Sequence, residues 1–469
     1  MEELLLMVVF QVLLFLPANC MALATPTIGF QYLNVHELVT ETSNSHHLSK
    51  SHVHKAGKWA LNLVHRDAIS GRNYSSHHHR FQELMNRDSR RVAGLTRRVA
   101  ALTGLAYSSL QDFGSEVVSG LEEGSGEYFV RVGVGSPPRE QYMVIDSGSD
   151  ITWVQCQPCS QCYHQAGPVF DPAQSTTFYN VGCDSTVCGL LDRAARCQAG
   201  WCRYEVSYRD GSYTKGTMAL EMLTFGQTEV RNVAIGCGHR NRGLFVGAAG
   251  LLGLGRGPMS FMAQLGGQTG GAFLYCLASR GMEMPGSIVF GRGAAVPTSA
   301  MWVPLMRNPW APSLYYIRLV GLGVGGIRLP VPEEVFRLSA MGDGGVIMDT
   351  GTAVTRLPVL AYEAVRNAFV QGTMGLPWAP ATSIFDTCYD LSGFRTVQVP
   401  TVSFYFAGGT VLTLPARNYM IPVDGMGTFC LAFAPSSSGL SIVGNIQQEG
   451  IQITFDLANG FVGFGPNTC

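Results

Sequence analysis

The sequence predicts an all-β protein made of two similar lobes. From residue 127 onward, short runs of β-branched and aromatic residues alternate with Gly, Pro, Asp and Ser, a pattern typical of strands and turns. An Asp-hydroxyl-Gly-hydroxyl turn occurs twice, at 146–149 and 349–352, and each copy lies between two apolar runs. An apolar-apolar-Gly segment follows in each half, at 250–254 and 442–445, where glycine would let another strand approach closely. We therefore expect a duplicated lobe that contributes one carboxylate per half, with the site where the lobes meet.

The first residues of the chain are typical of an export signal. An apolar run from Leu4 to Leu16 is followed by small residues around Ala24, although the usual positive charge before the run is missing. A signal anchor is the alternative, but no later apolar run reaches about 18 residues, as a membrane span requires. We predict a signal peptide over residues 1–24, entry into the secretory pathway and no stable membrane insertion.

Residues 25–123 form a basic section that carries most of the histidines. From Phe81 to Leu102, apolar positions alternate with arginines in a pattern that predicts an amphipathic basic helix. A solvated polar face is the ordinary interpretation, but a cationic segment between an export signal and two carboxylates favours a propeptide. We predict an intramolecular inhibitor whose Lys and Arg side chains lie across the cleft and whose histidines charge as the pH falls. The Asn73 sequon, a glycosylation site, lies in the same section.

The remaining part predicts short strands and few helices. Strands are expected at 128–134, 142–145, 288–290, 315–319, 402–406, 411–414 and 451–455, and short helices around 258–265 and 358–371. Twelve cysteines beyond Cys20 predict six disulfides in an oxidising compartment, and their pairing does not follow from the sequence. The spacing of Cys156, Cys159 and Cys162 also suits zinc, which secretion disfavours.

These motifs resemble those of the pepsin-type aspartic endopeptidases over about residues 124–469. The cysteine-rich segment from Cys156 to Cys202 is similar to the nepenthesin-like branch and, within it, to the plant aspartic proteases in guard cell. The resemblance implies a bilobal double β-barrel with a cleft between two pseudo-symmetric lobes, at 124–310 and 311–469. We expect a monomer that needs no cofactor or metal, located in the apoplast, with the ER or vacuole as alternatives.

The same resemblance implies roles for particular residues. Asp146 and Asp349 would face each other, Tyr208 would tip a mobile flap over the substrate, and Trp153 would pack against Tyr208 and hydrogen-bond it. From the residues alone, Tyr208 and Trp153 could equally be core aromatics. Arg209 departs from the glycine more common at that position of the flap. The family pairing implies the disulfides Cys156–Cys159, Cys162–Cys237, Cys183–Cys202, Cys188–Cys197, Cys276–Cys469 and Cys388–Cys430.

The chemistry explains why these residue types are needed. Two carboxylates about 3 Å apart share one proton and titrate as a pair, so one can activate water while the other donates. Ser149 and Thr352 would hydrogen-bond the outer carboxylate oxygens, and Gly148 and Gly351 would permit turns that bring backbone N–H groups near.

We therefore predict an aspartic endopeptidase that acts on polypeptides with an acid pH optimum and is made as a secreted zymogen. The alternative is a non-catalytic binding or inhibitor protein on the same scaffold. A glycoside hydrolase is disfavoured because the two carboxylates would be too close for that chemistry. With 14% charged residues and a net charge of −1, the chain is not expected to bind nucleic acid.

Overall fold

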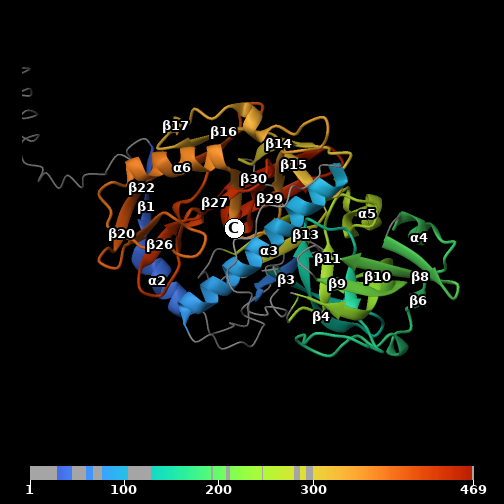
Figure 1. The fold of residues 1–469 in the computed structure, drawn as a ribbon. Helices are drawn as coiled ribbons and strands as arrows, with labels where there is room; N and C mark the ends of the chain where they lie inside the picture. Colours follow the sequence, from blue (N-terminus) through green and yellow to red (C-terminus); the bar gives the residue numbers. More distant parts are fainter. Residues whose placement is uncertain are drawn as a thin grey trace, which may run out of the picture.

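The computed structural model describes residues 29–44, 60–66, 76–103, 128–191, 194–207, 212–243, 245, 247–278, 286–291, 299–466 and 469. The predicted signal peptide, the Asn73 sequon and the predicted flap residues Tyr208 and Arg209 lie outside these residues. The described chain is mostly β-sheet, arranged as two lobes with one long helix lying across the face between them (Figure 1). The prediction of an all-β, bilobal fold with few helices is confirmed.

The N-terminal lobe is formed mainly by long antiparallel strands and two short helices. Its elements are β3 (Tyr128–Val134), β4 (Arg139–Asp146), β5 (Trp153–Gln155), β6 (Tyr179–Asn180), α4 (Thr186–Leu190), β7 (Ala195–Gln198), β8 (Trp201–Ser207), β9 (Tyr213–Phe225), β10 (Thr228–Arg242), β11 (Gly250–Gly253) and α5 (Phe261–Leu265). Strand β11 runs parallel to β4, and its last residue, Gly253, lies beside Asp146. The first aspartate is therefore fixed at the end of a buried strand.

The C-terminal lobe repeats this arrangement around the second aspartate. Its elements are β15 (Tyr315–Ile317), β16 (Leu319–Val324), β17 (Ile327–Arg328), β18 (Val346–Met348), β19 (Thr355–Pro358), α6 (Val359–Gly372), β20 (Trp378–Ala379), β21 (Cys388–Asp390), β22 (Thr396–Pro400), β23 (Val402–Phe406), β24 (Val411–Thr413), β25 (Met420–Pro422), β26 (Thr428–Leu431), β27 (Phe433–Ser436) and β28 (Ser441–Val443). Strand β28 runs parallel to β18, which ends directly before Asp349. At Gly444, an added Cβ would lie 2.5 Å from the carbonyl oxygen of Ala353, so only glycine allows this approach.

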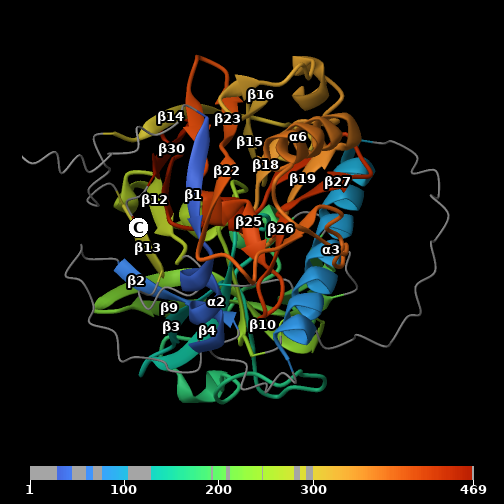
Figure 2. The ribbon, with the colours of Figure 1, turned by 90° about the vertical axis from the view of Figure 1, so that its left-hand side faces the viewer.

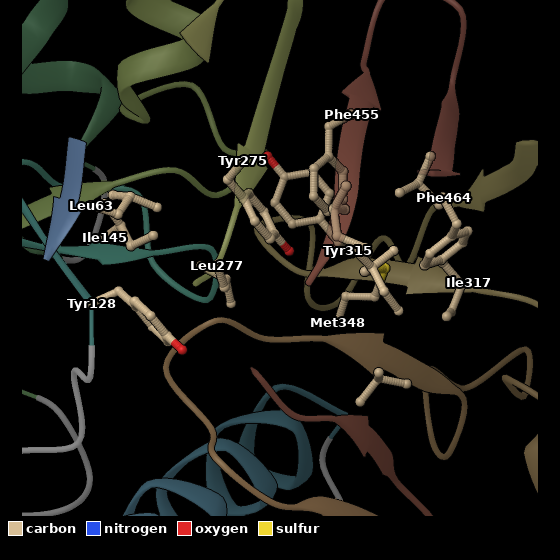
Figure 3. Close-up of a cluster of buried hydrophobic side chains, with 14 of the residues drawn as sticks. Leu63, Tyr128, Ile145, Tyr275, Leu277, Tyr315, Ile317, Met348, Phe455 and Phe464 are labelled. Atoms are coloured by element: carbon tan, nitrogen blue, oxygen red, sulfur yellow. The ribbon is translucent and has the colours of Figure 1, made fainter. Parts of the chain in front are cut away.

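A sheet built from both halves of the sequence joins the lobes. It contains β12 (Ala272–Cys276), β13 (Gly286–Phe290), β14 (Met301–Met306), β29 (Ile451–Asp456) and β30 (Phe461–Pro466), with β12 paired to β29 and β14 to β30. Aromatic side chains of this sheet pack with Tyr315 of β15 in the buried core. The ring of Phe455 lies 4.4 Å from that of Tyr315 and 6.0 Å from that of Tyr275 (Figure 3). This buried layer holds the two halves in a fixed relation.

The basic front section contributes two strands and two helices. Strand β1 (Phe30–Asn34) pairs with β22, α2 (Val35–Asn44) follows it, and β2 (Ala60–His65) lies between β13 and β3 as a full member of the sheet (Figure 2). Helix α3 (His77–Thr103) then crosses between the lobes. The predicted basic helix is confirmed, as are the predicted short helices, which appear as α5 and α6.

Four of the six predicted disulfide pairs differ from those in the structure. The bonds implied by the resemblance as Cys156–Cys159, Cys162–Cys237, Cys183–Cys202 and Cys188–Cys197 are wrong, because the structure has Cys156–Cys237, Cys159–Cys162, Cys183–Cys197 and Cys188–Cys202. The two others, Cys276–Cys469 and Cys388–Cys430, are as predicted. All three cysteines of the zinc-like spacing are in disulfide bonds.

Strand register explains the changed pairs. Strand β5 is parallel to β10, and the N–H of Cys156 donates to the carbonyl of Gly238, which places Cys156 beside Cys237 with 5.3 Å between their Cα atoms. In the hairpin of β7 and β8, Cys197 and Cys202 are directly opposite each other, and each bonds to a cysteine outside the hairpin. The spacing of the cysteines in the sequence does not reveal which partner each of them takes.

Candidate active site

Each predicted catalytic aspartate is held by its own turn. The Asp146 carboxylate accepts a hydrogen bond from Ser149 Oγ (2.7 Å to Oδ2) and one from the N–H of Gly148 (2.9 Å to Oδ1). Asp349 Oδ2 accepts a hydrogen bond from Thr352 Oγ1 at 2.6 Å. Both aspartates are buried. The hydroxyl groups therefore lie where the sequence placed them and fix the plane of each carboxyl group.

A single guanidinium group from helix α3 binds both aspartates. Nη2 of Arg91 donates to Oδ1 of Asp146 at 2.6 Å and to Oδ1 of Asp349 at 2.8 Å. Its Nε donates to Asp349 Oδ2 at 3.0 Å, and its Nη1 to Asp146 Oδ2 at 3.3 Å. Because one nitrogen reaches both carboxylates, the two halves of the chain direct their acidic groups to one point. A cation from the front section lies between them, as the sequence predicted.

The charge of Arg91 changes how the site titrates. Burial alone would raise the pKa of Asp146, but the nearby Arg91 charge, with the hydrogen bonds from Arg91, Ser149 and Gly148, brings this pKa below its ordinary value. Burial would lower the pKa of Arg91, yet the two aspartates outweigh burial and hold it well above its ordinary value. The arrangement is therefore an ionic one, with Arg91 charged and Asp146 ionised.

The second residues of the two turns, Ser147 and Thr350, connect the lobes. The N–H of Thr350 donates to Ser147 Oγ at 3.0 Å, and the N–H of Ser147 donates to Thr350 Oγ1 at 3.2 Å. Both side chains are buried. No role for these hydroxyls was predicted from the sequence. The signal was present, since a hydroxyl occupies the same position in both turns.

Helix α3 is anchored on both sides of Arg91. Toward its N-terminus, Phe81 packs on Phe385 of the C-terminal lobe, with ring centroids 5.8 Å apart. Toward its C-terminus, Leu95 and Val99 pack in a buried cluster on the same lobe. Nη1 of Arg98 also donates to the carbonyl of Gly148 at 2.5 Å, beside the first aspartate. The glycines of the two turns leave room for Arg91, because a Cβ at Gly351 would lie 2.9 Å from its Cζ.

Trp153 lies in the core of the N-terminal lobe. Its side chain is fully buried, and its ring meets Phe245 edge-on at 5.1 Å between centroids. The predicted hydrogen bond to Tyr208 involves a residue outside the described part of the chain, so that role stays a prediction.

A cavity of about 670 Å³ lies beside helix α3. It is lined by apolar side chains of the N-terminal lobe, including those of Ile151, Phe245 and Met259, and by Arg91 and Arg98 of the helix. The helix thus fills only part of the space next to the aspartates.

Within the described ranges, no group of three or more His, Cys, Asp or Glu side chains is arranged to hold a metal ion. None of the helices described in the structure is long and apolar enough to cross a membrane.

Comparison with known proteins gives consistent results for both lobes. Residues 128–292 match the family described as xylanase inhibitor N-terminal, and residues 314–466 match xylanase inhibitor C-terminal. The chain is 61% identical over 440 residues to protein aspartic protease in guard cell 2 of Arabidopsis thaliana, covering 93% of this chain and 92% of that one. It is 35% identical to aspartic proteinase nepenthesin-1 of Nepenthes gracilis, covering 93% and 96%. The crystal structure of edgp superposes with a TM-score of 0.60 at 20% identity, covering 72% of this chain and 91% of that one, and this likeness concerns the fold.

Proposed function

The chain belongs to the pepsin-like plant aspartic proteases and is an aspartic endopeptidase, and from this premise we propose that Asp146 and Asp349 hydrolyse the peptide bond by activating a water molecule. One observation carries the proposal: both carboxylates bind the same guanidinium group, so they converge on a space of the size of a few atoms. Two carboxylates so placed share a single proton when no cation lies between them.

The proposed reaction needs no covalent intermediate. The ionised aspartate takes a proton from water while the water oxygen attacks the carbonyl carbon, and the protonated aspartate gives its proton to the carbonyl oxygen. Collapse of the tetrahedral intermediate breaks the C–N bond, and the proton taken from water passes to the leaving nitrogen. One hydroxyl of the intermediate returns its proton to the other aspartate, which forms the product carboxyl group and restores the singly protonated pair. Ser149 and Thr352 keep the carboxyl groups in plane throughout, because each donates to an outer oxygen.

We further propose that the chain is made as a zymogen with an acid pH optimum. In support, Arg91 occupies the position that the water and the scissile bond would need, and α3 is held over the site by apolar packing at both ends. Acid would favour release, since protonation of Asp146 removes a charge that binds Arg91. The front section would then act as an intramolecular inhibitor that proteolysis removes.

The site of action is proposed from the sequence alone. The export signal and the even number of cysteines favour the secretory pathway and the apoplast, with the ER or vacuole as alternatives. We likewise propose from the sequence alone that the protein is a monomer. Six disulfides join described residues, as an oxidising compartment would allow.

A second candidate function is inhibition of another enzyme. The matching families are described as xylanase inhibitors, so a scaffold of this kind can serve as a binding protein. Retention of both aspartates, both supporting hydroxyls and an arginine that neutralises the pair favours catalysis, because a pure binding protein has no use for them.

The test is a peptidase assay on purified precursor and on processed protein. Processed wild-type protein is expected to cleave an extended peptide at pH 3 to 5, and Asp146→Asn or Asp349→Asn is expected to lower kcat by at least about 10⁴-fold, since each removes one of two cooperating groups. Circular dichroism of each variant controls for folding. Peptide cleavage that survives either substitution, or potent xylanase inhibition without cleavage, would overturn the proposal.

A further inference from the structure

A second polar contact of helix α3 lies one turn before Arg91. Asp88 is buried, and its Oδ1 accepts hydrogen bonds from the backbone N–H groups of Ala353 (2.5 Å) and Val354 (3.1 Å). Its Oδ2 forms an ion pair with Nη2 of Arg356. All three donors belong to the segment that follows the second aspartate turn. One carboxylate of the front section thus fills a site built from two backbone amides and one guanidinium.

The site belongs to the lobe and not to the helix. Arg356 is the second residue of β19, where it lies beside Ala434 of β27 and Ile442 of β28. The neighbouring Thr355 points to the opposite face of the strand, where its Oγ1 bonds Gln447. The strand therefore holds Arg356 toward α3 by its register in a three-stranded arrangement.

The site has binding capacity that Asp88 does not use. Arg356 is only 5% exposed, and its Nε meets no hydrogen-bond acceptor among the described residues. A guanidinium can bind a carboxylate through two parallel N–H groups, and an aspartate on a helix reaches only one of them here. A buried donor without an acceptor costs free energy, so a ligand that supplied one would be favoured.

We propose that Arg356, with the N–H groups of Ala353 and Val354, forms a subsite of the processed enzyme that selects substrates with an acidic residue near the scissile bond. This inference rests on the proposed function, in which α3 leaves the cleft. Asp88 then stands in for the substrate carboxylate. It lies three residues from Arg91, about 4.5 Å along the helix, so the subsite is close to the bond that is cut.

The two contacts of the helix would divide the work. Arg91 neutralises the two catalytic aspartates, whereas Asp88 pairs with Arg356, the residue that would bind the acidic side chain of the substrate. Departure of the helix leaves Arg356 without its counter-ion, and an acidic side chain of the substrate restores the pair. The proposed selection is therefore for a side-chain carboxyl group over an amide of the same shape.

The experiment uses processed enzyme and matched quenched-fluorescence peptides. Each pair of peptides differs only by Glu or Gln, placed in turn at the four positions on either side of the cleaved bond. At pH 5.5, wild type is expected to show a kcat/KM about tenfold higher for Glu than for Gln at one position or two adjacent positions. Arg356→Gln is expected to bring this ratio to about one, and Arg356→Lys is expected to retain part of it.

Arg366→Gln is the matched control, because Arg366 pairs with Asp386 on the outer face of α6. It is expected to keep the wild-type ratio. A ratio near one at every position, or a ratio that Arg356→Gln leaves unchanged, would overturn the subsite.

A binding measurement separates this inference from the proposed function. Fluorescence polarisation with processed Asp146→Asn protein measures the Kd of the same Glu and Gln peptides without cleavage. The Glu peptide is expected to bind about tenfold more tightly, and the added substitution Arg356→Gln is expected to remove the difference. If wild type cleaves none of the peptides, the proposed function fails, while this Kd ratio still supports or refutes the subsite.

Discussion

Ser147 and Thr350 hold each other across the junction of the two lobes, each donating its backbone N–H to the other's hydroxyl at 3.2 and 3.0 Å. Each residue lies directly after an aspartate, so these bonds set how far apart the two carboxyl groups lie. The geometry of the dyad thus depends on two groups that carry out no chemistry themselves.

Loss of one of these hydroxyls is expected to slow catalysis more than it weakens binding. Ser147→Ala leaves the buried N–H of Thr350 without an acceptor, at a cost of about 1 to 3 kcal/mol. Because the aspartates would then be less well placed, we expect a 10- to 100-fold lower kcat with little change in KM. Steady-state kinetics on processed protein check this. The removal of an exposed hydroxyl, Thr382→Ala, is the control, and an unchanged kcat in Ser147→Ala would contradict the prediction.

Arg91 is expected to provide most of the inhibitory strength of the front section. A synthetic peptide of residues 77–103 should inhibit processed enzyme, and Arg91→Ala in the peptide should raise the inhibition constant at least about 100-fold, because it removes the cation shared by two buried acids. Arg97→Ala, at an exposed position of the same helix, should change it less than about threefold. Equal inhibition by the two altered peptides would show that packing alone blocks the site.

The inhibition should weaken as the pH falls. Arg91 lowers the pKa of Asp146 in the helix-bound state. The ionised form of Asp146 therefore favours binding of the helix at pH values above the ordinary aspartate pKa of about 4. This contribution is lost as the pH falls through the lowered pKa. Asp88 acts in the opposite sense. Burial raises its pKa despite Arg356, so its protonation favours the bound helix in acid.

This opposition gives a test with a matched variant. Between pH 6 and 3, the inhibition constant of the wild-type peptide should rise as acid is added. In the Asp88→Asn peptide the opposing contribution is gone, so the same plot should be steeper. A wild-type inhibition constant that falls in acid, or an Asp88→Asn plot that is flatter, would show that these two groups do not set the pH dependence.

The corrected disulfides predict different stabilities for neighbouring bonds. The bond between Cys156 and Cys237 closes a loop with a sequence separation of 81, whereas Cys159 and Cys162 are separated by 3. By loop entropy, replacing the first pair by alanine should cost about 3 kcal/mol more unfolding free energy than replacing the second. Urea unfolding checks this. Peptide mapping of unreduced protein should recover a fragment joining residues near 156 and 237, and a fragment joining 156 to 159 would restore the family pairing.

The sequence predicted those features that depend on local pattern. The turns at Asp146 and Asp349, their supporting hydroxyls and the basic helix all follow from residue type and spacing. The disulfide pairs did not. The partner of Cys156, for example, is set by the register between β5 and β10, two strands that are far apart in the sequence. The role of Ser147 was missed for the same reason, since its partner is 203 residues away.

The contact of Asp88 with Arg356 could not be predicted from the sequence either. In the sequence, Asp88 is one acid among several arginines, and Arg356 is an isolated cation in an apolar run. Only the path of α3 across the C-terminal lobe brings them together. Strand β2 was not predicted either, because six residues of ordinary composition do not reveal that they complete a sheet.

Strand β2 implies that the barrel is assembled around a strand from the front section. It supplies hydrogen bonds to β13 on one side and to β3 on the other, with Leu63 buried between them. Without β2, strands β13 and β3 would each have an exposed edge with unpaired backbone N–H and C=O groups. Exposed edge strands of this kind pair with other chains and cause aggregation. The full-length chain is therefore the proper starting material for recombinant production, because it supplies β2 to the sheet as the barrel forms.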